Sequence, residues 1–117
     1  MQSYKELFVW QKAYQLSLKI YSATKNFPKD EIFGLVSQMR RASVSIISNI
    51  AEGNARGSKK EYVQFLRIAF GSGAELEAQI ELSKDLGLLK KEDYTALTKL
   101  HTEVMKMLNA MISKLSN

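Results

Sequence analysis

Apolar residues recur every three or four positions along most of the chain, the spacing that places them on one face of an α-helix. Four such stretches follow one another, at about residues 4–25, 30–52, 59–86 and 91–115. No segment alternates apolar and polar residues as a half-buried strand does. The pattern therefore predicts one all-α domain over residues 1–117, folded as an antiparallel up-down-up-down four-helix bundle.

Local signals mark where these helices begin and end. The segments Ser3–Glu6 and Ser58–Glu61 both have the S-x-x-E order of a capping box, which satisfies free amides at a helix start. Pro28 separates the first two helices because proline cannot continue the helical hydrogen bonds. We expect Gly53 to end the second helix, with a short polar loop behind it, and Gly87 to cap the third.

A polar stripe follows the second helix on a different face from its apolar stripe. Short hydroxyl and amide groups lie between a basic and an acidic end, and such groups need fixed partners once they leave water. This favours a buried or interfacial hydrogen-bonding seam over an ordinary solvated face that happens to carry short side chains. With Glu75 added as a candidate ion-pair partner, the polar seam comprises Gln38, Arg41, Ser45, Asn49, Glu52 and Glu75.

Two glycines, Gly71 and Gly73, lie inside the third helical stretch. Each costs about 1 kcal/mol there relative to alanine, so a compensating feature is expected. Close approach of a neighbouring helix is the first interpretation and a kink is the alternative. A phosphate-binding loop is not indicated, because no strand precedes the glycines.

The first helix is apolar over more than one face. Trp10, Tyr14 and Tyr21 extend its apolar surface beyond the stripe expected to face the core. Self-association through these three aromatic residues is the economical explanation. The alternative is that the rings cap the edge of the bundle with their polar tips in water.

Composition narrows the class of protein. The chain has 117 residues and no cysteine, which excludes disulfides, thiolate zinc sites and a catalytic thiol. Its start lacks the basic-then-apolar order of a signal peptide. The longest uncharged run, residues 42–51, is about half of the roughly 20 residues that cross a bilayer. We therefore expect a soluble cytoplasmic protein with no membrane partner.

Positive charge is concentrated in the first part of the chain. The net charge is +5, and residues 1–70 carry +6 whereas residues 71–117 carry −1. A basic surface favours polyanionic partners. The candidate nucleic-acid contacts on an exposed face are Arg40, Arg56, Lys59 and Lys60. Arg41 has two interpretations, an ion pair with Glu52, Glu61 or Glu75, or a phosphate contact.

Candidate catalytic chemistry is sparse. His101 is the only histidine and is expected to be solvated on a lysine-rich helix, and no Glu-x-x-His motif of di-iron bundles occurs. Glu77, Glu81 and Asp85 form one acidic stripe, which is usually a solvated or subunit-facing surface. We expect no catalytic residues, no metal and no cofactor. A carboxylate metal site beside Glu75 is the minor alternative.

A set of motifs along nearly the whole chain resembles the bacterial four-helix-bundle family of 23S ribosomal RNA intervening-sequence proteins, or S23 proteins. The matching residues are Val9-Trp10-Gln11-Lys12-Ala13, Phe27-Pro28, Glu31, Phe33-Gly34-Leu35, Gln38, Arg40-Arg41-Ala42, Ser45-Ile46, Asn49-Ile50-Ala51-Glu52-Gly53, Phe65-Leu66, Ala69, Gly71-Ser72 and Glu75-Leu76-Glu77. As a set, these motifs are specific to the family.

The resemblance implies a four-helix protomer that assembles into a ring-like homopentamer. It also implies a link with nucleic acid, because the family is similar to the basic pentameric accessory protein of diversity-generating retroelements, which binds nucleic acid and a reverse transcriptase. It marks Arg41, Ser45, Asn49, Glu52 and Glu75 as characteristic polar positions and implies no catalytic role for them.

Together, the residues and the resemblance predict a non-enzymatic homo-oligomer that binds RNA or DNA with little sequence specificity. Its expected partners are further copies of itself, nucleic acid and a nucleic-acid-processing protein. The alternative is a protein-interaction scaffold with no nucleic-acid role. Salt separates the two, because phosphate binding weakens steeply as salt rises whereas an apolar interface does not.

Overall fold

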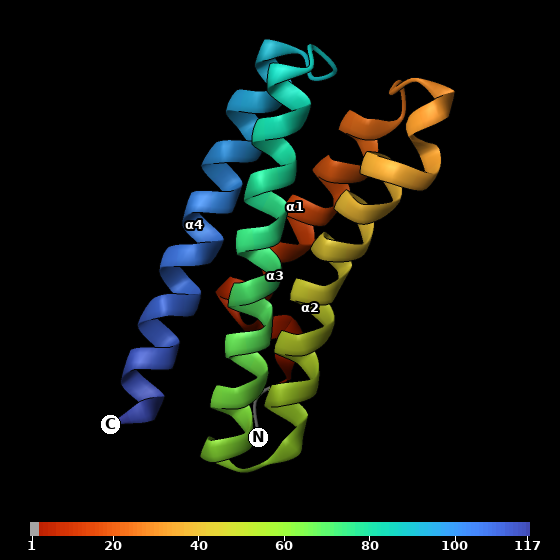
Figure 1. Cartoon of the computed structure of the whole chain (residues 1–117). Coiled ribbons are helices and arrows are strands. Elements are labelled where there is room, and N and C mark those ends of the chain that lie inside the picture. The colour runs from red at the N-terminus through yellow and green to blue at the C-terminus, as the bar shows by residue number, and fades with distance from the viewer. Residues whose placement is uncertain (1–2) are drawn as a thin grey trace.

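The computed structural model describes residues 3–117, so Met1 and Gln2 of the predicted domain lie outside it. Its long helices are α1 (Phe8–Thr24), α2 (Ser37–Arg56), α3 (Lys59–Asp85) and α4 (Lys91–Ser116), and no strand occurs among the described residues. Successive helices run in opposite directions (Figure 1), and α1 contacts α2 and α4 while α3 contacts the same two helices. The all-helical prediction is confirmed.

The core lies along the length of a bundle that measures 43 × 23 × 21 Å. Every long helix contributes apolar side chains with 3–4 spacing, as an amphipathic helix must to cover its apolar stripe. The most completely buried apolar side chains are Leu16, Ile20, Met39, Ile46, Ile50, Leu66, Leu76, Leu97, Val104 and Leu108.

The start of the first helix differs from the prediction. Ser3 caps a 3-10 turn, Tyr4–Glu6, in which its hydroxyl accepts a hydrogen bond from the Lys5 amide at 3.3 Å. Leu7 then takes an extended conformation (φ −74°, ψ 128°), and α1 begins at Phe8. The S-x-x-E order therefore caps a short turn ahead of the helix.

An irregular connection joins α1 to α2. After Pro28 come a 3-10 turn, Lys29–Glu31, and a π-helical turn, Ile32–Val36. Gly34 in that turn has φ −100° and ψ −110°, which is outside the helical region. The predicted start at residue 30 falls on this connection, and regular α2 begins at Ser37.

The predicted end of α2 at Gly53 is wrong. The helix continues to Arg56, and Gly57 supplies the left-handed cap with φ 84°. Gly53 is buried inside the helix, where an added Cβ would lie 2.8 Å from the Cβ of Phe65. The glycine therefore serves close packing of α2 on α3, and the turn is made four residues later.

The predicted start of α3 and its cap at Gly87 are confirmed, and the helix ends at Asp85, one residue before the predicted limit. Ser58 accepts a hydrogen bond from the Glu61 amide at 3.1 Å, and α3 begins at Lys59. At the other end, Gly87 has φ 76°. The amides of Gly87 and Leu88 donate to the carbonyls of Lys84 and Ser83, both at 2.9 Å, which is the Schellman pattern.

Candidate nucleic-acid interface

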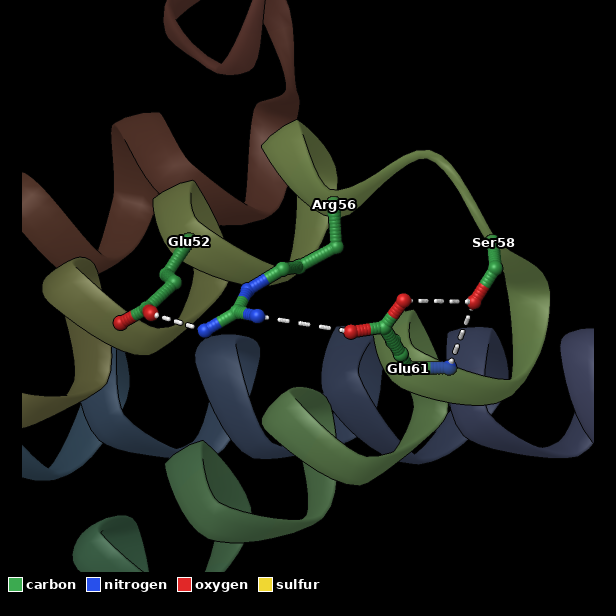
Figure 2. Close-up of polar contacts among 4 residues, drawn as sticks. All are labelled: Glu52, Arg56, Ser58 and Glu61. Carbon is green, nitrogen blue, oxygen red and sulfur yellow. Dashed lines mark hydrogen bonds and ion pairs between the residues drawn. The ribbon is translucent and has the colours of Figure 1, made fainter.

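Arg56 lies at the junction of α2 and α3, where two carboxylates hold it (Figure 2). Its Nη2 donates to Glu52 Oε2 at 2.8 Å, and its Nη1 lies 3.5 Å from Glu61 Oε2. The guanidinium also sits 5.0 Å from the centre of the Phe65 ring. The hydrogen bond with Glu52 raises the pKa of Arg56 above its ordinary value. Arg56 is therefore an ion-paired structural residue more than a free cation.

Lys59 and Lys60 occupy the first turn of α3, and both side chains are exposed. Neither forms an ion pair with any residue of 3–117. They border a surface pocket of about 410 Å³ whose lining includes Gln64 of α3 and Leu115 and Ser116 of α4. A helix N-terminus also favours anions. These two lysines are the predicted nucleic-acid contacts that remain free and adjacent.

Arg40 lies apart from that group, contrary to the expected common face. Its Nε donates to Thr24 Oγ1 at 3.1 Å and its Nη2 to the carbonyl of Tyr21 at 3.2 Å. The guanidinium covers the Tyr21 ring at 4.6 Å. Arg56 follows 16 residues later, about 24 Å along the helix axis. Arg40 therefore joins α2 to α1 and belongs to another end of the bundle.

The middle of the polar seam bridges α2 and α3. The hydroxyls of Ser45 and Ser72 are hydrogen-bonded at 2.8 Å. Asn49 Nδ2 donates to the carbonyl and the hydroxyl of Ser45, at 2.8 and 3.1 Å. The sequence did not predict Ser72 as a member of the seam, although Ser72 lies between Gly71 and Gly73. The seam therefore has partially buried hydrogen bonds at its centre.

Three other members of the seam, two of them charged, lie in solvent. Gln38, Arg41 and Glu75 are exposed, and within the described chain Arg41 and Glu75 have neither an ion pair nor a hydrogen bond. An ion pair of Arg41 inside the protomer, one of the open interpretations, is therefore not found among the described residues. Its candidate partners Glu52 and Glu61 bind Arg56 instead. The interfacial interpretation of Arg41 stays a prediction.

The aromatic surface of α1 is partly covered by the protomer itself. Trp10 stacks on Tyr14 with ring centres 4.9 Å apart, and it meets Tyr4 edge-on at 5.0 Å. Tyr21 lies beneath Arg40. Tyr14 and Tyr21 still expose 44% and 42% of their surface. Part of the extra apolar surface predicted for α1 is thus covered by side chains of the same chain.

His101 is buried, so the prediction that it is solvated is wrong. Only 6% of its surface is exposed, and its Nε2 lies 2.8 Å from the carbonyl oxygen of Gly73. Because a carbonyl only accepts hydrogen bonds, Nε2 is the protonated nitrogen. The sequence signal was the 3–4 spacing of His101 with Leu97, Val104 and Leu108, which form the buried face of α4.

The acidic stripe of α3 is only partly solvated. Glu81 accepts a hydrogen bond from the Tyr94 hydroxyl at 2.6 Å and pairs with Lys84 at 3.0 Å. The Tyr94 hydrogen bond, with Lys84, holds the pKa of Glu81 below its ordinary value.

Across residues 3–117, no three histidine or carboxylate side chains gather in a way that could hold a metal ion. None of the described helices could span a membrane.

Comparison with known proteins assigns the family. A family model described as 23S rRNA-intervening sequence protein matches residues 5–110. A crystal structure of a protein of unknown function, from the S23 ribosomal protein family of Bacteroides thetaiotaomicron, is similar with a TM-score of 0.79 and 26% identity. The match covers 89% of this chain and 97% of that one. No curated protein matches. The chain belongs to the family of 23S rRNA-intervening sequence proteins.

Proposed function

We propose that this protein is a non-enzymatic homo-oligomer that binds RNA or DNA with little sequence specificity. The observation that carries the proposal is the pair of free, adjacent lysines, Lys59 and Lys60, on the first turn of α3. The two carboxylates beside them, Glu52 and Glu61, share the single guanidinium of Arg56, so these five side chains sum to a net charge of +1. Phosphate groups therefore meet two exposed lysines that form no ion pair with the described residues at this end of the bundle. The family name, which refers to an intervening sequence in 23S rRNA, agrees with such a partner.

The start of α4 offers a second lysine pair of matched charge. Lys90 and Lys91 are also adjacent and exposed, but Glu92 and Asp93 follow them directly in the first turn. Asp93 is paired with Lys19 at 2.8 Å, so Lys19, Lys90, Lys91, Glu92 and Asp93 also sum to a net charge of +1. This second cluster therefore matches the first in charge and differs in its place on the bundle. Lys90 and Lys91 are therefore a matched control for Lys59 and Lys60.

Assembly multiplies the contacts. A ring-like homopentamer, which the family resemblance implies, carries about +25 from protomers of +5 and presents the lysine pair five times. Each phosphate neutralised by the protein releases counterions and steepens the salt dependence by roughly 0.9 on a logarithmic scale. Weak contacts on one protomer thus add up to useful affinity on a long nucleic acid.

Fluorescence anisotropy of labelled structured RNA and of duplex DNA, at low and at physiological salt, tests the proposal. We expect binding that weakens steeply with salt, and a K59Q/K60Q variant whose affinity falls about tenfold or more with a shallower salt slope. K90Q/K91Q removes the same charge and should bind nearly as the wild type does. Equal losses in both variants would contradict a localised contact.

The alternative function, a protein-interaction scaffold, is favoured by two exposed aromatic side chains. Phe33 in the α1–α2 connection is 93% exposed and Phe8 at the start of α1 is 76% exposed. Large exposed apolar side chains often mark contacts with other proteins. Absence of RNA and DNA binding even at low salt would retire the nucleic-acid proposal and leave the scaffold.

A further inference from the structure

The outer surface of α3 carries a second helix-packing stripe. Its members are spaced i, i+3, i+7, i+10 and i+14, which is the spacing of a helix–helix seam, and every one is exposed. Ile68 and Leu82 at its ends expose 51% and 50% of their surface. This stripe, the α3 outer stripe, consists of Ile68, Gly71, Glu75, Ala78 and Leu82.

Gly71 in this stripe has no explanation within the protomer. A Cβ added at Gly71 meets no atom within 4 Å, whereas one added at Gly73 overlaps Met105. A glycine in a helix interior is destabilising, so a gain elsewhere should offset it. Close approach of another helix to the outer side of α3 would provide that gain, since glycine lacks a Cβ and lets two backbones come nearer than a larger residue does.

The neighbouring helix α2 has a matching stripe with the same spacing. Its residues are small or apolar apart from one arginine, where a solvated helix face usually carries lysine and glutamate. We call it the α2 outer stripe, and it consists of Arg41, Val44, Ser48, Ala51 and Ala55. Each of the two stripes thus holds one charge, Arg41 on α2 and Glu75 on α3.

The two charges lie at the same height along the bundle. The Ser45–Ser72 hydrogen bond, 2.8 Å long, sets the register of the antiparallel helices. Arg41 precedes Ser45 by four residues and Glu75 follows Ser72 by three, so they stand about 6 Å and about 4.5 Å from that level, on the same side. A rotation about an axis parallel to the bundle preserves these heights, and it brings Arg41 of one copy beside Glu75 of the next.

We infer that the α2 outer stripe of one copy packs against the α3 outer stripe of the next, with Arg41 paired to Glu75 across the interface. The inference rests on the proposed homo-oligomer and names its contact surface. Two different surfaces of each copy meet, and such a head-to-tail contact forms a ring when the rotation between copies closes. It pairs unlike charges, whereas two α3 outer stripes centred on each other would oppose two copies of Glu75.

Charge reversal tests the pairing. Arg41→Glu and Glu75→Arg should each raise the dissociation constant of the oligomer about tenfold or more, because like charges then face each other. The double variant R41E/E75R has the wild-type net charge and should recover the wild-type mass in sedimentation velocity. Lys99→Glu and Glu92→Arg make the same charge changes on exposed positions of α4 and should leave the mass unchanged.

Gly71→Leu gives a second, independent test. It has room inside the protomer, so helicity should be retained, but it should block the close approach and lower the oligomer mass. An assembled wild type whose mass neither the charge reversals nor Gly71→Leu alters would overturn the inference and point to α1, where Trp10→Ala is the corresponding variant. A monomeric wild type would overturn both the oligomer and this interface. A wild-type protein that assembles but does not bind RNA or DNA would contradict only the nucleic-acid function and leave this interface standing.

Discussion

The inner and outer sides of α3 differ in whether another part of the same chain packs against them. On the inner side, Gly73 packs against Met105 and its carbonyl is hydrogen-bonded by His101, both from α4. On the outer side, a Cβ added at Gly71 would meet no described atom within 4 Å, and Glu75 has no ion pair among the described residues. The same residue type is thus explained by the protomer at one position and unexplained two residues earlier. The contrast shows where the folded chain is self-sufficient and where a partner is expected.

Substitution of Gly73 should have the largest effect on stability. Gly73→Leu forces a side chain into space that Met105 already occupies, and overpacking of this kind typically costs about 1–3 kcal/mol. The midpoint of urea unfolding measures the loss. Gly71→Leu, measured under conditions that keep the protein monomeric, is the matched control and should not be destabilised. Equal losses at both glycines would remove the contrast between the two sides.

His101→Ala should rank next. It removes a buried side chain and its hydrogen bond to the Gly73 carbonyl, and we expect a loss of about 2 kcal/mol in the free energy of unfolding. His101→Gln keeps a side-chain N–H donor and should recover part of that loss. A variant His101→Ala as stable as the wild type would show that the hydrogen bond contributes nothing.

Gly71→Ala should stabilise the isolated protomer. Its Cβ meets no atom within 4 Å, and alanine is favoured over glycine in a helix by about 1 kcal/mol. The melting temperature of the monomeric form should therefore rise. A fall would show that Gly71 has a conformational role inside the protomer.

The smallest effect concerns two glutamates of α3. Glu81 is hydrogen-bonded by Tyr94 of α4, which lowers the pKa of that carboxyl, whereas Glu75 has no such contact. A lowered pKa in the folded state stabilises the fold above the ordinary pKa of a glutamate, and this contribution is lost as pH falls through the folded-state pKa. Tyr94→Phe should move the pKa of Glu81 upward in a carbon-13 NMR titration. An unchanged titration would assign the shift to Lys84 alone.

Much of the fold follows from the sequence. The 3–4 spacing of apolar residues predicted four helices, and the signals at Ser58 and Gly87 placed two of the helix limits correctly. The prediction that α2 ends at Gly53 was wrong because a glycine near a helix end can either form the turn or allow a close contact. The packing of Gly53 against Phe65 shows that it allows a close contact. The π-helical turn around Gly34 was also missed, because the 3–4 spacing of apolar residues does not report a backbone departure at one residue.

The candidate site was less predictable. Adjacent helix residues point about 100° apart, so Arg40 and Arg41 had to face different neighbours, but periodicity did not say which arginine would meet α1. Tyr21 and Thr24, which bind Arg40, come from the preceding long helix, 19 and 16 residues away. The same holds for His101, whose partner Gly73 lies 28 residues away.

The short connection between α2 and α3 has a consequence for how the chain folds. Only Gly57 and Ser58 separate the two helices, so bringing them together closes a very small loop and loses little chain entropy. Packing of Gly53 on Phe65 and the Arg56 ion pairs lie right at this turn. We therefore expect the α2–α3 hairpin to gain amide protection before α1 and α4 in pulse-labelled hydrogen exchange during refolding, and α1 and α4 to complete the core on it.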